Sequence, residues 1–423
     1  MTQELLEKLN FVKETLRNVE SYEHECRVLN FDQETICPSG GMEGQGEVHA
    51  FLSTKAFELV KQPLFTESAE YLYQHKDEID DVPNRILADD LHRDYLKIKN
   101  ITPAMDHEFS LIYNKSFVDW LNAKQKSDFS VFAPSLKKVR DVEVKKVTLR
   151  EDKLPDTYDN LLDDYERGMT THDLDVIFNR CRERLVLLLK TIQAAEKNIR
   201  KDFLSRTVTD EQQQRMSRYL LETMGFDFNR GAFTTTEHLF TDGLGRNDVR
   251  VTTHYYTNMF CSSMYSIIHE GGYALFEMYQ PGEDREHYIN NDKTMGMHES
   301  VSRFYENRIG RSKGFIHLIY DAVKKIFPDV MYDVSERELY ESVNVVSPSL
   351  VRTQADEFTY TFHIMIRYEL EKMIVNGKAE IEDLPQLWND KYEEYLACRL
   401  NGSKYLSVYL IKQILRVVHM NHS

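Results

Sequence analysis

The chain has 423 residues and a formal net charge of −16, from 69 acidic and 53 basic side chains. A field this negative repels phosphate backbones and anionic membranes, so we expect neither nucleic acid nor a membrane as a partner. Glycine (17) and proline (10) are scarce, which favours helix because these two residues punctuate helices.

The N-terminal stretch, residues 1–20, is charged and amphipathic, with apolar residues at helical spacing from Leu5 onward. It lacks the apolar core of a signal peptide, and no run in the sequence approaches the roughly 18 apolar residues that a membrane helix needs. The five cysteines include no Cys-x-x-Cys pair, so neither a disulfide framework nor a thiolate zinc site is indicated. We therefore expect a reduced, cytoplasmic protein.

Helical periodicity continues along most of the chain and predicts long helices at residues 174–199 and 362–375. There is no internal repeat and no low-complexity linker, so we expect one continuous helical body. Residues 233–256 differ, because they are rich in β-branched residues and predict a short β-hairpin that leads into the next helix. The sparse breaks between helices fall at residues 37–41, 101–103, 280–282 and 327–328.

The helix expected at residues 259–279 contains His269-Glu270-Gly271-Gly272-Tyr273, which opens like the zinc-peptidase pattern H-E-x-x-H. Positions i and i+4 share a helix face, so two imidazoles there can hold one metal ion. The glutamate lies about 100° round the helix, where it can act as general base on metal-bound water. In this chain the fifth position of the pattern is Tyr273 instead of histidine. The alternative is that the His-Glu pair belongs to no functional site, as is usual for such a pair inside a helix.

The two consecutive glycines, Gly271 and Gly272, make this segment more distinctive than a His-Glu pair alone. Each costs about 1 kcal/mol relative to alanine inside a helix, so another element is expected to approach the backbone closely there. A kink or a simple packing notch is the alternative.

A second His-Glu pair, His298-Glu299, opens the next predicted helix. A glutamate on a second helix is where many helical zinc peptidases take their third metal ligand. The alternative is a solvated or salt-bridged helix start.

The last segment, residues 402–423, has a different composition. It contains no acidic residue, although the whole chain is acidic, and it carries an apolar stripe from Leu410 to Val418. We interpret it as a segment of separate origin; an ordinary amphipathic C-terminal helix is the alternative.

Read together, these strings resemble the ordered motifs of the thermostable carboxypeptidase (carboxypeptidase Taq) family of metallocarboxypeptidases. The likeness runs from about residue 1 to residue 400, in the order of the family's motifs. The segments that carry it are Phe31-Asp32-Gln33-Glu34-Thr35 (W-D-Q-E-T in the family), His238-Leu239-Phe240 (H-P-F), Asp248-Val249-Arg250-Val251-Thr252 (D-x-R-x-T), His269 to Tyr273 (H-E-x-x-H), His298-Glu299-Ser300 (H-E-S) and Val351-Arg352-Thr353-Gln354-Ala355-Asp356 (V-R-x-x-A-D).

The resemblance implies metal-dependent release of C-terminal amino acids from peptides, in an all-helical and usually homodimeric protein. We therefore predict an all-α, elongated, multi-helix zincin-like body with a deep groove and a small β-hairpin near the site. Residues 1–401 would form a single metallocarboxypeptidase domain, C-terminally incomplete, and residues 402–423 a tail foreign to the family.

Carried over residue by residue, the resemblance makes His269 and Glu299 metal ligands and Glu270 the general base. Arg250 and Arg352 are candidates for binding the terminal carboxylate of the substrate, because a guanidinium can pair with both carboxylate oxygens. The implied cofactor is a divalent metal, with zinc expected and cobalt or manganese as alternatives.

Each substrate-binding candidate has a structural alternative. Arg250 and Arg352 could instead form ion pairs with Asp248 and Asp356. His238 is expected to line the same groove, and a satisfied core histidine is the alternative.

Three departures from the family pattern point to a damaged metal site. Tyr273 replaces the second metal-binding imidazole, and a phenol with a reference pKa near 10 is a doubtful replacement ligand. Leu239 replaces the proline of His-Pro-Phe. The family's C-terminal block, G-x-x-Q-D-x-H-W, is absent after Asn401-Gly402.

Three functions remain open on the sequence. The first is an impaired metallocarboxypeptidase with doubtful metal occupancy. The second is a catalytically inactive pseudopeptidase that acts as a peptide-binding or dimerisation module. A zinc aminopeptidase is less favoured, because a pair of arginines suits a carboxylate rather than a free amine.

Overall fold

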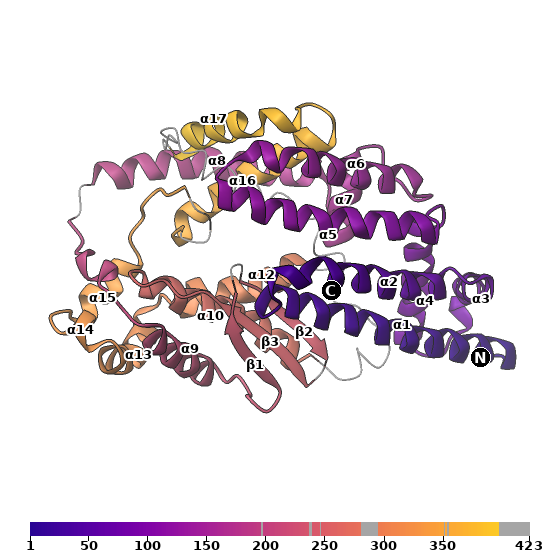
Figure 1. Cartoon of the computed structure of the whole chain (residues 1–423), viewed down its shortest axis with the longest axis horizontal. Helices are drawn as coiled ribbons and strands as arrows, with labels where there is room; N and C mark the ends of the chain where they lie inside the picture. Colours follow the sequence, from indigo (N-terminus) through magenta and orange to yellow (C-terminus); the bar gives the residue numbers. More distant parts are fainter. Residues whose placement is uncertain are drawn as a thin grey trace.

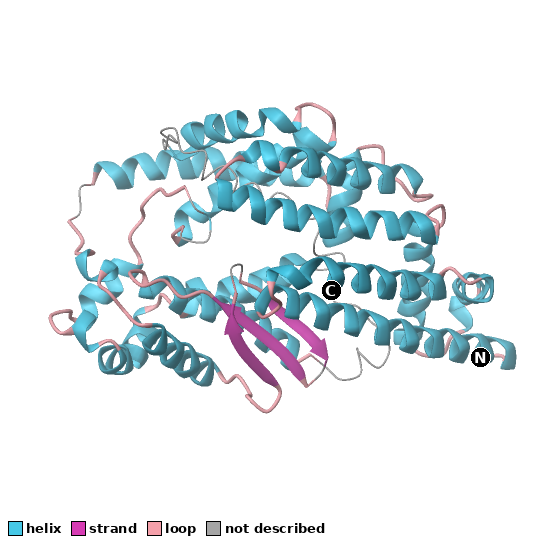
Figure 2. Cartoon of the chain, in the orientation of Figure 1, coloured by secondary structure: helices cyan, strands magenta, loops and turns pink. Residues whose placement is uncertain are grey.

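The computed structural model describes residues 1–195, 198–236, 239–245, 247–280, 295–350, 352 and 355–396. Within these ranges the chain is almost wholly helical and carries one small sheet, which confirms the predicted all-α class (Figures 1 and 2). In chain order the elements are α1 (Gln3–Thr35), α2 (Met42–Val60), α3 (Pro63–Gln74), α4 (Val82–Ile98), α5 (Pro103–Lys126), α6 (Ala133–Leu149), α7 (Thr157–Tyr165), α8 (Thr171–Ala194), α9 (Asp210–Met224), β1 (Gly231–Thr235), β2 (Thr241–Gly245), β3 (Asp248–Thr253), α10 (Phe260–Met278), α12 (Met295–Arg303), a π-helical turn (Phe304–Ile309), α13 (Lys313–Ile326), α14 (Pro328–Met331), α15 (Glu336–Val343), α16 (Glu357–Val375) and α17 (Leu384–Leu396).

The first two helices pack against each other as a long hairpin, which contacts several other parts of the molecule (Figure 1). Leu5, Leu9 and Val12 lie on one face of α1 and are buried against α3 and α4. Further along, α1 contacts β2, and α2 contacts α5. The hairpin therefore lies beside both the sheet and the upper helical layer.

The upper layer in Figure 1 has its own hydrophobic core. Phe109, Phe132, Phe362 and Trp388 are almost fully buried there, and they come from α5, from the start of α6, from α16 and from α17. The predicted long helices are present but shifted. In particular, α16 begins five residues before residue 362, because the Asp356 carboxylate accepts hydrogen bonds from the first free backbone N–H groups.

A second core lies in the lower part of the molecule, where α9, α10 and α13 pack with the sheet. Phe260, Met264, Ile267 and Ile268 of α10 are buried in it. Because α10 is covered on nearly all sides, polar side chains that it carries are enclosed by protein.

The predicted hairpin is correct in part. The pair β2–β3 is an antiparallel hairpin, but a third strand, β1, pairs with β3 in parallel, in the order β1-β3-β2. The prediction took the threonine-rich β1 as one arm of the hairpin. The true antiparallel partner is β2, whose two glycines give it little strand propensity.

In the part of the chain that the structure describes, no helix is both long and apolar enough to cross a bilayer. The proposed tail at 402–423 lies outside the described residues, so the boundary after residue 401 stays a prediction.

Candidate active site

The two glycines of α10 let neighbouring helices approach its backbone. A Cβ atom added to Gly272 would lie 2.8 Å from the Cα atom of Ser302 on α12. A Cβ atom at Gly271 would meet Leu221 and Met224 of α9 at 3.0 Å. The close approach predicted from the sequence is therefore confirmed, and it brings α12 against the His269 face of α10.

The structure places His269 and Glu299 side by side. The Nε2 atom of His269 lies 3.8 Å from the Oε2 atom of Glu299. Zinc bonds of about 2.0–2.2 Å allow two ligand atoms of one ion to lie up to roughly 4.2 Å apart. The separation is thus compatible with one shared ion.

Tyr273, at the position where the resemblance implies a second imidazole, donates a hydrogen bond from its hydroxyl to Oε2 of Glu299. Its ring stands edge-on to the His269 ring, with centroids 5.0 Å apart, and lies 4.4 Å from the ring of His298. The phenol therefore reaches the expected centre, but it acts there as a hydrogen-bond donor to the carboxylate.

A cationic side chain, Arg303, connects the two carboxylates beside His269. Its Nε atom donates to Oε1 of Glu299 at 2.9 Å, and its Nη1 atom donates to Oε2 of Glu306 at 2.8 Å. Glu306 is 7% exposed, and its Oε2 lies 3.0 Å from Nδ1 of His269. Arg311 donates to its other oxygen at 3.3 Å.

The positive neighbours keep both carboxylates ionised. Burial opposes ionisation of Glu299, but His269, Arg303 and the Tyr273 hydroxyl lower its pKa from 4.5 to about 2. Burial likewise opposes ionisation of Glu306, yet Arg303, His269 and Arg311 hold the pKa of Glu306 well below its ordinary value.

The expected general base, Glu270, lies next to His269 on the same helix and is 4% exposed. The Thr241 hydroxyl, at the start of β2, lies 2.8 Å from Oε2 of Glu270 and donates to it. The sheet therefore fixes the orientation of this carboxylate.

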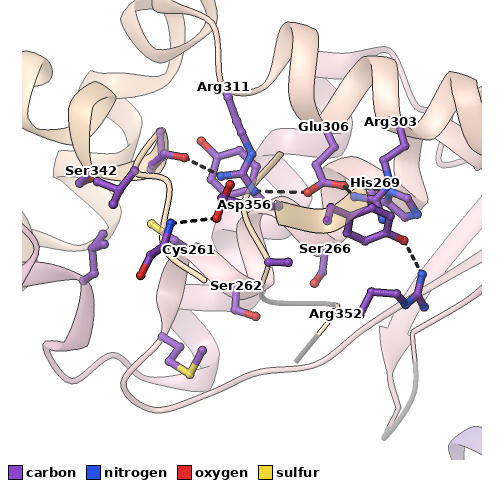
Figure 3. Close-up of a pocket in the computed structure, with 18 of the residues that line it drawn as sticks. Cys261, Ser262, Ser266, His269, Arg303, Glu306, Arg311, Ser342, Arg352 and Asp356 are labelled. Carbon is purple, nitrogen blue, oxygen red and sulfur yellow. Dashed lines mark hydrogen bonds and ion pairs between the residues drawn. The ribbon is translucent and has the colours of Figure 1, made fainter. Parts of the chain in front are cut away.

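A cavity of about 330 Å³ opens beside these residues. Figure 3 shows His269, Glu306, Arg303 and Arg352 at one end of it, and Cys261, Ser262 and Ser342 toward the other. Glu270 also lines this cavity. A carboxylate that could accept a proton and cations that could bind an anion thus face the same space.

Arg352 lines the cavity and donates a hydrogen bond to the hydroxyl of Tyr360. The ring of Tyr360 also lies 3.4 Å below the Arg303 guanidinium. Tyr360 therefore connects the arginine expected to bind substrate with the arginine of the carboxylate pair. Asp356, the alternative partner considered for Arg352, caps α16.

Arg250 is placed differently. It forms a two-pronged ion pair with Asp248 at 3.0 and 2.8 Å, and its guanidinium lies 5.0 Å from the ring centroid of Phe31. It does not line the cavity that Arg352 lines. The structural ion pair considered as its alternative role is therefore present. His238 lies outside the described residues, so its role stays a prediction.

A metal site of the usual catalytic kind takes three protein ligands. Within the described ranges, no three His, Cys, Asp or Glu side chains are arranged to hold a metal ion. His269 and Glu299 supply two donors, and the Tyr273 hydroxyl is engaged with Glu299.

Five residues that the site description uses were not predicted: Thr241, Arg303, Glu306, Arg311 and Tyr360. Arg303 could have been found, because it lies four residues after Glu299 on one helix, a spacing that favours ion pairs. Glu306 could not, because a π-helical turn at Phe304–Ile309 changes the helical phase after α12.

Sequence comparison relates the chain to known peptidases. A family model described as Carboxypeptidase Taq (M32) metallopeptidase matches residues 11–404. Carboxypeptidase 1 of Bacillus subtilis (strain 168) is 33% identical over 381 residues, which are 90% of this chain and 76% of that protein. Thermostable carboxypeptidase 1 of Pyrococcus furiosus is 32% identical over 385 residues, again 90% of this chain and 76% of the relative.

Solved structures agree with the sequence matches. A crystal structure of BsuCP superposes with a TM-score of 0.88 at 30% identity and covers 98% of this chain and 88% of its own. A Pyrococcus furiosus carboxypeptidase structure, Apo-Mg, superposes with a TM-score of 0.84 at 28% identity and covers 100% of this chain and 88% of its own.

Proposed function

The chain belongs to the carboxypeptidase Taq (M32) metallopeptidase family, and from this premise we propose that it binds peptides by their C-terminus but releases the terminal amino acid only slowly. Family membership makes it a metallocarboxypeptidase by descent, with peptides as substrates and a divalent metal as the expected cofactor. The reduced turnover is our proposal for this particular chain.

One observation carries the proposal of impairment: the Tyr273 hydroxyl bonds to Glu299 where the family has an imidazole ligand. A site with one imidazole and one carboxylate should hold zinc more loosely than a three-ligand site. When bound, the metal would polarise the scissile carbonyl and activate water.

The protein's own groups support peptide binding. We assign the terminal carboxylate of the peptide to Arg352, which lines the cavity and is oriented by Tyr360. Glu270 is assigned as the proton acceptor, because it is oriented by Thr241 and faces the same cavity. Arg250 is assigned a supporting role through Asp248, because that ion pair already occupies its guanidinium.

The remaining features are proposed from the family resemblance. We propose zinc as the metal, with cobalt or manganese as alternatives, because all three accept nitrogen and oxygen ligands. Homodimerisation is proposed on the same basis. A cytoplasmic location is proposed from the scattered cysteines and from the charged N-terminal stretch. The foreign origin of residues 402–423 rests on their composition alone.

The test compares the unaltered chain with Tyr273→His. The substitution completes the ligand set, so we expect zinc affinity to rise on the order of 100-fold. Removing a residue that only contacts a metal ligand typically lowers metal affinity about 10–100-fold, and a direct ligand should matter at least as much. Cleavage of a blocked tripeptide should rise with zinc content. The double variant Tyr273→His/Glu270→Gln is the control, since it should bind zinc but show little turnover. Robust turnover by the unaltered chain would contradict the proposed impairment.

A non-catalytic peptide-binding protein is the second candidate. It is favoured by the hydrogen bonds from Tyr273 and Arg303 to Glu299, which satisfy that carboxylate without a metal ion. Turnover at saturating zinc separates the two functions. Both proteins should bind a peptide with a free C-terminal carboxylate in calorimetry, but a pseudopeptidase shows no turnover.

A further inference from the structure

Both carboxylate oxygens of Glu299 accept hydrogen bonds from protein groups. Arg303 donates to Oε1 at 2.9 Å, and the Tyr273 hydroxyl donates to Oε2. The second of these oxygens is the one that faces Nε2 of His269, at 3.8 Å. The oxygen nearest the imidazole is therefore the one that Tyr273 occupies.

The surrounding charges are balanced within the protein. Two carboxylates, Glu299 and Glu306, lie against two guanidinium groups, Arg303 and Arg311. His269 is held from its other side, where Nδ1 lies 3.0 Å from Glu306. Each charged group of this network thus has a partner of opposite charge, and the network needs no external cation to be satisfied.

We propose that Tyr273 competes with a divalent metal ion for Glu299, so that the Tyr273–Glu299 hydrogen bond closes the site when no metal is present. This inference rests on the proposed function, which assigns His269 and Glu299 as the remaining ligands. It goes further, because it assigns Tyr273 an active part in excluding the metal. On this proposal, a metal ion that binds Oε2 of Glu299 has to displace the phenol.

Tyr273→Phe separates three roles for this side chain, because it removes the hydroxyl and keeps the ring. If Tyr273 is merely a missing ligand, the substitution leaves zinc affinity unchanged. If Tyr273 binds the metal as a phenolate, the affinity falls. If the hydroxyl competes with the metal, the affinity rises although no ligand has been added.

The experiment strips metal from the full-length protein with a chelator and measures Zn²⁺ affinity by competition with a chromophoric chelator. We expect Tyr273→Phe to bind Zn²⁺ about tenfold more tightly than the unaltered chain, since a hydrogen bond to a charged group no longer has to be broken. Melting curves give a second measurement: the metal-free variant should melt lower, and added Zn²⁺ should raise its melting temperature by more than that of the unaltered chain.

Tyr279→Phe is the matched control. Tyr279 follows the same helix, and its hydroxyl contacts the carbonyl of Gly225 at 3.3 Å, so Zn²⁺ affinity should not change. An unchanged or lower affinity in Tyr273→Phe would overturn the competition. Tight, stoichiometric zinc binding by the unaltered chain would instead overturn the proposed impairment. The ratio of the Zn²⁺ affinities of Tyr273→Phe and the unaltered chain would still decide the role of the hydroxyl.

Discussion

Tyr273 is a single substitution that changes what its neighbours can bind. An imidazole at this position could offer a lone pair to a metal, whereas the phenol donates its hydrogen to Glu299 instead. The resemblance to H-E-x-x-H implies a metal ligand at this position, because positions i and i+4 share a helix face, and its loss here stays a prediction. The sequence did not predict the new hydrogen bond, which depends on how far α12 lies from α10.

Glu371 of α16 provides a pH-dependent test of the upper core. Burial raises its pKa from 4.5 to about 7, although the Tyr158 hydroxyl, which donates to it at 2.7 Å, and Arg367 act in the opposite direction. A carboxyl group with a raised pKa favours the folded state when it is protonated. Its contribution to stability is therefore complete below about pH 4.5 and is lost as the pH rises through about 7.

We predict that Glu371→Gln removes this loss. Between pH 4.5 and 7, the free energy of unfolding of the unaltered chain should fall by about 1–2 kcal/mol more than that of the variant. This figure is smaller than the full pKa shift implies, because water partly screens a side chain that is only partly buried. Urea unfolding across this range measures the difference, with Glu382→Gln, an exposed position, as control. A difference that does not change with pH would show that Glu371 is not the titrating group.

At the scale of elements, the contact between α10 and α12 builds the site. Glycine at 272 allows the backbone of α12 to come close enough for Glu299 to approach His269. The π-helical turn after α12 then directs Glu306 to the other side of the same imidazole. The first of these features could be read from the paired glycines, and the second could not, because a local change of helical phase leaves no regular pattern in the sequence.

We predict that Gly272→Ala destabilises the protein despite the higher helix propensity of alanine. The new Cβ would lie 2.8 Å from the Cα atom of Ser302, so the two helices must separate. Overpacking of about 1–3 kcal/mol should outweigh the gain of about 1 kcal/mol in propensity. Gly314→Ala in α13, where an added Cβ meets nothing within 4 Å, should be neutral or stabilising by the same melting assay. A Gly272→Ala protein as stable as the unaltered chain would argue against tight helix contact.

At the scale of the whole molecule, the fold class followed from the scarcity of glycine and proline and from helical periodicity. The predicted breaks at 101–103 and 327–328 agree with the starts of α5 at Pro103 and α14 at Pro328, because proline is accepted in the first turn of a helix. The strand β1 was expected, but as an antiparallel partner of β3 rather than a parallel one. The strand β2 was missed because its two glycines give it little strand propensity. The cavity likewise depends on contacts between distant segments, because its lining residues run from Lys201 to Tyr360, and periodicity does not report such contacts.

The zinc content of the unaltered, full-length chain tests the central claim most directly. Protein purified under native conditions and dialysed against buffer with a stated free zinc concentration should retain well below one zinc ion per chain, because no third His, Cys, Asp or Glu ligand joins His269 and Glu299 among the described residues. Elemental analysis measures this ratio. One tightly held zinc ion per chain, together with rapid cleavage of a blocked tripeptide, would contradict the claim that Tyr273 has impaired the metal site.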